Sequence, residues 1–229
     1  MMLLKYILLL IVIFIIFFIY CHISKLTTIN NNLDIIQTTD PDPELIYELL
    51  DQHKPIIFQR EIYYWKDINK LIGKPLLDIK NAISQHPDIL YSTSIKNNLD
   101  PLNIVFSHDW NIDLRNVIMD DKSGIFFIKQ HNLSQCFGCI TGQFRIILSP
   151  NNESHFIEPF INNVSSKDAA ELLDKNPPEF NFIEIIIRQG NVIYIPWGWC
   201  YFIYNPNPTI ECVIVDAINQ SIISNFVIQ

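Results

Sequence analysis

Residues 187–199 read IRQGNVIYIPWGW, and this stretch decides the fold. An apolar run over residues 192–195 lies between a Gln-Gly-Asn triplet at residues 189–191 and a Pro-Trp-Gly triplet at residues 196–198. Glycine and asparagine adopt the backbone angles of tight turns that bulky residues resist, and proline favours turns as well. The stretch therefore predicts β-strands that follow one another through two short turns.

The same pattern of short apolar runs and turn residues continues outward through the second half of the chain. It predicts strands over residues 124–129, 136–141, 144–148, 182–188, 192–195, 200–204 and 209–215. Many short strands separated by Gly, Asn and Pro are typical of a β-sandwich or barrel. A helix is predicted at residues 168–175, where two prolines follow and end it.

The first half of the chain is mixed. Residues 43–52 have apolar side chains three and four positions apart, which predicts a short amphipathic helix. Residues 54–60 predict a buried strand, and residues 68–71 and 76–84 predict helical turns. We therefore expect one mainly β domain with helices contributed by its N-terminal half.

The N-terminus predicts a membrane anchor. Residues 6–21 read YILLLIVIFIIFFIYC and carry no charge, and with residues 1–4 the run approaches the ~20 residues that cross a bilayer as a helix. The bulky residues 18–20 stand where signal-peptide cleavage would require small ones. The predicted order is a transmembrane anchor (1–22), a polar tether (23–42) and the folded domain (43–229).

A single-pass membrane protein is therefore expected, but the flanking charges do not set its orientation. Lys5 on one side is matched by Lys25 on the other. Four Asn-X-Ser triplets slightly favour a lumenal domain, at Asn132, Asn152, Asn163 and Asn219. The net charge of -8 excludes a nucleic-acid partner, because phosphate binding requires clustered Lys and Arg.

The motifs of the chain, taken together, resemble the JmjC-like cupin family. Residues 187–199 are similar to the family's L-x-P-G-D-x-L-Y-I-P-P-x-W-W-H hallmark. Residues 54–58, 64–65, 158–160 and 177–180 resemble further family motifs in the same order. The fold-motif positions are Gly142, Gly190, Tyr194, Pro196, Gly198 and Trp199. The resemblance implies a double-stranded β-helix, or jelly roll, behind one transmembrane helix, and related jelly rolls often form homodimers.

Active members of that family bind Fe(II) through His-x-Asp/Glu and a distant His, and bind 2-oxoglutarate through a basic residue. The resemblance places the metal-ligand positions on Lys129, His131 and Tyr201, and the co-substrate position on Phe144. The neighbouring Arg145 should point to the opposite face of its strand. None of the four is the family's residue type. The resemblance thus implies a catalytically inactive pseudoenzyme, without metal or cofactor, that binds an unknown small-molecule ligand or protein partner.

Two other functions stay open. The first is an Fe(II)- and 2-oxoglutarate-dependent protein hydroxylase whose metal ligands come from other positions, such as His131, His155 or Cys139. The second is a structural or assembly protein of the membrane, whose surface is the functional part. His86-Pro87-Asp88 reads as His-x-Asp, but it lies in the helical half and is interpreted as a turn.

Five cysteines leave further alternatives. Cys136 and Cys139 have the spacing of a zinc half-site, which His131, Cys200 or Cys212 could complete. Residues three apart on a strand point to opposite faces, which disfavours zinc unless the strand bends. Cys200 and Cys212 could form a disulfide on adjacent strands, although buried free thiols are the simpler interpretation.

Overall fold

The computed structural model describes residues 2–26, 28, 30–39, 43–64, 68–85, 110–117, 125–127, 134–150, 181–204 and 212–219. Its helical elements are α1 (Met2–Leu26), α2 (Pro43–Leu50), α3 (Leu76–Gln85) and two short 3-10 helices, η1 (Glu61–Tyr64) and η2 (Ile68–Leu71). Its strands are β1 (Ile36–Thr39), β2 (Ile56–Gln59), β3 (Trp110–Val117), β4 (Ile125–Phe127), β5 (Ser134–Thr141), β6 (Gln143–Pro150), β7 (Ile183–Arg188), β8 (Val192–Pro196), β9 (Trp199–Tyr204) and β10 (Cys212–Asn219).

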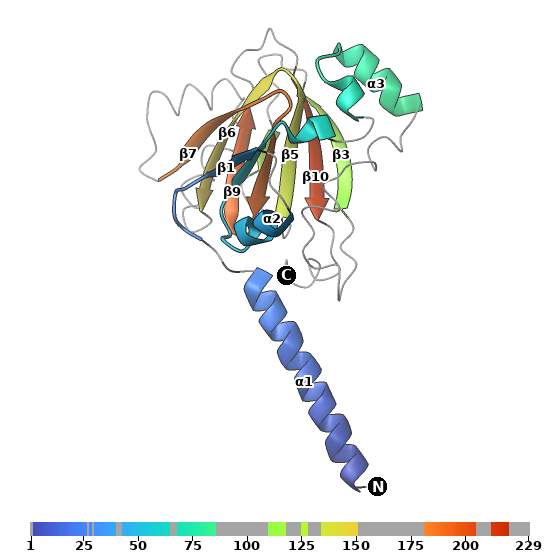
Figure 1. Ribbon diagram of the computed structural model, residues 1–229, viewed down its shortest axis with the longest axis vertical. Helices are drawn as coiled ribbons and strands as arrows, with labels where there is room; N and C mark the ends of the chain where they lie inside the picture. Colours follow the sequence, from blue (N-terminus) through green and yellow to red (C-terminus); the bar gives the residue numbers. More distant parts are fainter. Residues whose placement is uncertain are drawn as a thin grey trace.

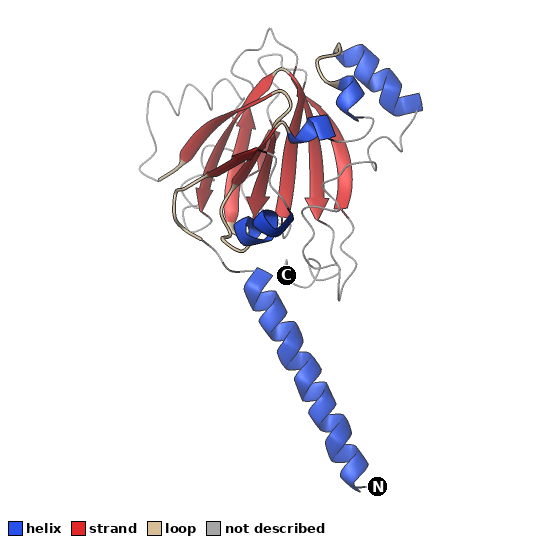
Figure 2. Ribbon diagram, viewed as in Figure 1, coloured by secondary structure: helices blue, strands red, loops and turns tan. Residues whose placement is uncertain are grey.

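The described strands form two sheets, which make up the two layers of the domain (Figure 1). The large sheet has the order β1-β2-β8-β5-β10-β3, and the small sheet has the order β4-β9-β6-β7. β1 pairs with β2 in parallel, and the other described pairs are antiparallel. This mostly antiparallel sandwich, drawn in red in Figure 2, fits the predicted jelly roll.

Strand alternation divides the buried side chains into two clusters, one on each face of the large sheet. On β5, Phe137 and Cys139 belong to one cluster, and Cys136 and Ile140 belong to the other. The inter-sheet core lies between the sheets and contains Ile57, Phe137, Cys139, Phe144, Ile146, Leu148, Ile187, Ile193, Ile195, Trp199, Tyr201, Ile203, Cys212 and Ile214. The outer core lies beneath α2, α3 and the 3-10 helices and contains Ile46, Leu49, Leu50, Ile56, Phe58, Ile62, Leu71, Ile79, Cys136, Ile140, Val192 and Tyr194.

The two predicted turns connect β7, β8 and β9, as expected. Gly190 and Gly198 have φ angles of 88° and 85°, in the region that favours glycine. The Gly190 N–H donates to the Cys139 carbonyl at 2.8 Å, and the Gly190 carbonyl accepts from the Ile62 N–H at 3.1 Å. The first turn therefore also ties β5 to η1.

The structure differs from the sequence prediction before residue 43. Residues 36–39 were expected in the polar tether, but they form β1 at the edge of the large sheet. Ile35 packs against the inter-sheet core and Ile36 against the outer core, so this short segment buries apolar surface on both faces. An ion pair between Lys54 and Asp34, with Nζ and Oδ2 2.9 Å apart, also holds it to the domain. The folded part thus begins before Pro43.

Other differences are smaller. β3 forms in a stretch for which no element was predicted, and Pro150, expected in a turn, is the last residue of β6. The predicted helix at residues 168–175 lies outside the described residues.

α1 extends away from the sheets as a separate helix (Figure 1). The side chains that the structure describes along it, from Lys5 to Cys21 and at Ser24, are all exposed. Among the described residues, no helix is long and apolar enough to cross a membrane.

Candidate functional site

The structure places two of the predicted site residues in the inter-sheet core. Tyr201 lies on β9 and Phe144 on β6, which are neighbouring strands of the small sheet. Both side chains are buried, with 3% and 0% of their surface exposed. The other two predicted positions, Lys129 and His131, lie outside the described residues.

Tyr201 makes a polar contact across the sandwich. Its hydroxyl donates a hydrogen bond to Oε1 of Gln135 at 2.7 Å, and both residues are buried. Gln135 belongs to β5 of the large sheet, so the bond joins the two layers. The Tyr201 ring also meets Phe137 edge to face, with centroids 5.1 Å apart. A buried bond of this kind contributes about 1 kcal/mol net and fixes the orientation of the phenol.

Phe144 and Arg145 point to opposite faces of β6, as the two-residue period predicts. Phe144 is in the inter-sheet core, whereas the Arg145 Nη1 atom lies 2.9 Å from Glu184 Oε1 on β7. Both ion-pair side chains are more than one third exposed. Arg145, which follows the predicted co-substrate position Phe144, is therefore part of an ion pair at the surface.

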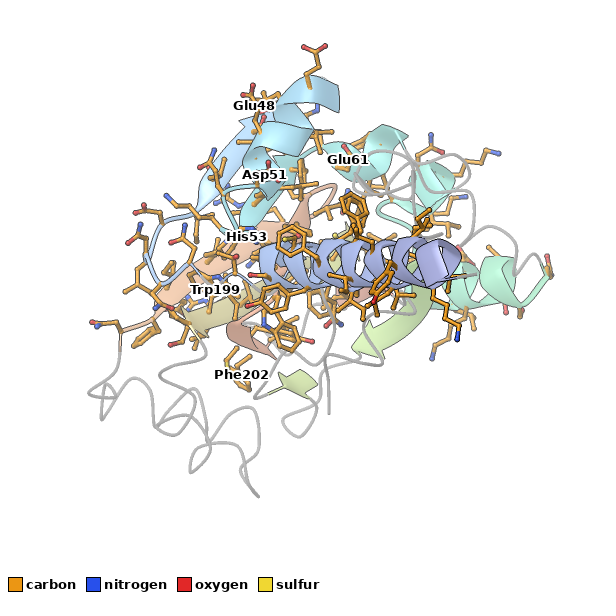
Figure 3. All side chains as sticks on the ribbon, turned by 90° about the horizontal axis from the view of Figure 1, so that it is seen from below. Glu48, Asp51, His53, Glu61, Trp199 and Phe202 are labelled. Atoms are coloured by element: carbon orange, nitrogen blue, oxygen red, sulfur yellow. The ribbon has the colours of Figure 1, made fainter. Side chains whose placement is uncertain are left out.

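Trp199 fills the inter-sheet core next to the second turn. Its side chain is fully buried, and the indole Nε1 has no hydrogen-bond partner among the residues that the structure describes. Phe202, three positions further along β9, is also buried but does not belong to the inter-sheet core. Figure 3 labels both residues. The aromatic side chains of this strand thus serve as packing on both of its faces.

The structure agrees with the simpler interpretation of Cys200 and Cys212 as buried thiols, and it turns Cys136 and Cys139 to opposite faces of β5. Cys136 is in the outer core and Cys139 in the inter-sheet core, so the two face away from each other across β5. Cys200 lies on the small sheet and Cys212 on the large one, and the two form no disulfide bond with each other. In the described part of the chain, no group of three or more His, Cys, Asp or Glu side chains is placed to hold a metal ion.

A thiol pair that the sequence did not indicate lies in the inter-sheet core. Cys139 and Cys212 lie on the neighbouring strands β5 and β10, and the Cys139 thiol lies 3.4 Å from the Thr141 and Gly142 carbonyl oxygens. Hydrogen bonding with Cys212, burial and the Coulombic effect of Cys212 raise the pKa of the Cys139 thiol well above its ordinary value. The Cys139 thiol is therefore protonated at neutral pH.

A polar cleft of about 510 Å³ lies where the segment after α1 meets the turn after α2. Its lining residues are Thr28, Asn30, Asn31, Asn32, Asp51, Gln52, His53 and Lys54. The Asn30 side-chain amide donates to the Gln52 carbonyl at 2.8 Å and connects the two walls. Figure 3, seen from the side on which α1 projects, labels Asp51 and His53. Amide, carboxylate and cationic groups of this kind suit a small polar ligand.

Comparison with known proteins identifies one family. The sequence profile of a family described as Cupin matches residues 86–227. The match includes every described strand except β1 and β2. No curated protein matches the sequence significantly.

Proposed function

The chain belongs to the cupin family, and we propose that it is a membrane-anchored cupin domain that binds a ligand or protein partner and has no iron-dependent oxygenase activity. The hydrogen bond between Tyr201 and Gln135 carries this proposal. In the resemblance to JmjC-like cupins, Tyr201 stands where the distant histidine ligand is expected. Here the position holds a buried phenol whose proton is donated to an amide oxygen.

The residues at the predicted positions do not fit the iron and 2-oxoglutarate of the active relatives. The expected metal site needs two imidazoles and one carboxylate around open coordination positions. Tyr201 is neither an imidazole nor a carboxylate. The resemblance places the other two ligand positions on Lys129 and His131. Phe144, at the co-substrate position, is fully buried and cannot pair with a carboxylate. No chemical step through iron follows from these side chains.

A binding role is supported by the polar cleft at residues 28–32 and 51–54. Its walls are held in place by the Asn30–Gln52 hydrogen bond and by the nearby ion pair of Lys54 with Asp34. Such a pre-formed site costs little ordering entropy when a ligand binds. We expect a small polar ligand or a polar segment of a partner to bind there.

The membrane anchor is supported by the sequence and extent of α1. Its uncharged run over residues 6–21, extended by the apolar residues 1–4, approaches the ~20 residues that span a bilayer as a helix. From Tyr6 to Cys21 the helix carries no charge, and its exposed apolar side chains lie on all sides. A helix that is apolar all round needs an apolar environment. We therefore infer that residues 1–22 lie in the bilayer.

The proposal about chemistry predicts that full-length protein in mild detergent binds no stoichiometric iron and does not decarboxylate 2-oxoglutarate. Elemental analysis after incubation with Fe(II), and succinate formation, measure this. The Tyr201→His variant is the matched test, because it supplies the missing imidazole at one position. It should also bind no iron, since one ligand does not make a site. One equivalent of iron in either protein, or turnover that requires both Fe(II) and 2-oxoglutarate, would contradict the proposal.

The proposal about the membrane predicts that carbonate washing leaves the full-length chain in the membrane pellet. A variant without residues 2–26 should move to the supernatant. Ile13→Lys places a charge in the middle of α1 at a cost of about 2.5–3.5 kcal/mol, so it should shift part of the protein to the soluble fraction. Immunoblotting of both fractions provides the measurement. Release of the unaltered chain without detergent would rule out the anchor.

A further inference from the structure

β7 is the end strand of the small sheet in the part of the chain that the structure describes. Among the described strands it pairs with β6 alone, and it forms one edge of the sandwich (Figure 1). Three side chains on its outer face are exposed, those of Glu184, Ile186 and Arg188. The edge of a sheet presents backbone N–H and C=O groups that a further strand can bind.

The hydrogen bonds to β6 determine which backbone groups of β7 point to the edge. At the end of this ladder, the Gln189 N–H donates to the Gly142 carbonyl at 3.1 Å. Hydrogen-bonded and non-hydrogen-bonded positions alternate along an antiparallel pair. The odd-numbered residues of β7 therefore direct their N–H and C=O groups toward β6, whereas Glu184, Ile186 and Arg188 direct theirs away from it.

The sequence of β7 is complementary to itself when two copies run antiparallel. A register centred on Ile186 places the two Ile186 residues opposite each other and each Glu184 opposite Arg188 of the second copy. On the inner face, Ile185 would lie opposite Ile187, so that apolar side chains continue the inter-sheet core. Of the registers in which the outward backbone groups face one another, only this one opposes the carboxylate to the guanidinium.

Exposure and hydrogen bonding agree with this register. Ile186 is 40% exposed, and a second copy would remove this apolar surface from water. The Glu184 carboxylate pairs with Arg145 on β6, and it would lie between that cation and Arg188 of the second copy. The two Ile186 residues would exchange both of their N–H···O=C bonds. Each Arg188 would bind through its N–H, because its carbonyl accepts from the Asn191 N–H in the turn.

We propose that β7 is a homodimer interface, at which two copies of the chain pair antiparallel about Ile186 and join their small sheets into one sheet. The occupant is a second copy, because the charges of this strand complement one another in the register that the backbone allows. The interface is separate from the polar cleft at residues 28–32 and 51–54 and does not depend on a ligand there.

The pairing also fixes how the two copies are turned. Antiparallel strands run in opposite directions, so a twofold axis perpendicular to the sheet relates the copies. α1 extends from one end of the strands (Figure 1), and the α1 helices of the dimer would therefore point in opposite directions. This consequence rests on the proposed membrane anchor: anchored chains that pair in this way join two facing bilayers.

The test uses full-length protein in mild detergent, where no shared bilayer restricts the two α1 helices. Size-exclusion chromatography with light scattering should give the protein mass of a dimer for the unaltered chain. Glu184→Arg and Arg188→Glu should each lower the dimer affinity by about tenfold or more, because each variant opposes like charges at both ends of the interface. An equimolar mixture of the two variants should dimerise again, because the two arginines of one copy then meet the two glutamates of the other.

Lys74→Glu is the matched control, because it reverses an exposed charge outside β7 and should leave the dimer unchanged. Circular dichroism shows whether each variant is folded. A second readout does not depend on the charge variants: in a chain that carries Cys21→Ala, a short bis-maleimide should link two copies through Ile186→Cys but not through Lys74→Cys.

A monomeric unaltered chain, a dimer that persists in both folded charge variants, a mixture that stays monomeric, or no link through Ile186→Cys would each refute the interface. Vesicles that carry the unaltered chain should cluster, and vesicles that carry either charge variant alone should not. Dimers in detergent without clustering of vesicles would refute the facing-bilayer arrangement and leave the interface in place. Carbonate washing tests the anchor separately.

Discussion

Replacing Trp199 with alanine is expected to lower the free energy of unfolding by about 3–5 kcal/mol. The Trp199 side chain is fully buried in the inter-sheet core. β9 is hydrogen-bonded on both sides, to β4 and to β6, so the backbone cannot move in to fill the cavity. Such a loss is a large part of the about 5–15 kcal/mol that stabilises a typical domain. Guanidinium unfolding of full-length protein in detergent, followed by circular dichroism, measures it.

Trp199→Phe is the matched control for that measurement. Phenylalanine keeps an aromatic ring in the core and also removes the buried indole N–H, which has no partner among the described residues. An unsatisfied buried donor costs about 1–3 kcal/mol, so its removal offsets part of the lost packing. We expect the phenylalanine variant to lose less than about 2 kcal/mol. An alanine variant within about 1 kcal/mol of the unaltered chain would show that Trp199 does not hold the two sheets together.

The strands of the second half were predictable because their limits are set locally. Gly190 and Gly198 adopt φ angles that favour glycine, and the turns that they form limit β8 to Val192–Pro196, one residue longer than predicted. β1 was not predicted, because its four residues, Ile-Gln-Thr-Thr, have no strong pattern. β1 forms because Ile35 packs against the inter-sheet core and Ile36 against the outer core. Both cores exist only in the folded domain.

The same distinction applies to the site. The inward direction of Phe144 and the outward direction of Arg145 follow from the strand period, which the sequence contains. The partner of Tyr201 does not follow from it, because Gln135 lies on the other sheet. The placement of Cys139 and Cys212 on neighbouring strands depends on the pairing of β5 with β10, whose register shifts at Ile140, and no local signal indicated this. The sequence thus predicted which way side chains point, but not which ones meet across the sandwich.

Replacing Gly190 with alanine is expected to lower the free energy of unfolding by about 2–4 kcal/mol. Its φ angle of 88° strains any residue that has a side chain. A Cβ atom there would lie 2.3 Å from Cε2 of Tyr63, far inside van der Waals contact. The backbone cannot shift easily, because Gly190 donates to the Cys139 carbonyl and accepts from the Ile62 N–H. The Tyr63 ring must therefore move.

Gly73→Ala separates the two causes of this loss. Gly73 also has a positive φ, 71°, but its Cβ would meet only the end of the Gln189 side chain, at 3.4 Å. The Gly73→Ala variant should therefore lose only the free energy of unfolding that is due to backbone strain, about 1 kcal/mol. In a protein that also carries Tyr63→Ala, Gly190→Ala should lower the free energy of unfolding by a similarly small amount, because the new Cβ no longer meets the Tyr63 ring. Equal losses for Gly190→Ala in both backgrounds would mean that the ring of Tyr63 does not pack on this turn. The Tyr63 ring would then contribute nothing to the contact between η1 and this turn, and the hydrogen bond from the Ile62 N–H to the Gly190 carbonyl would remain as the connection.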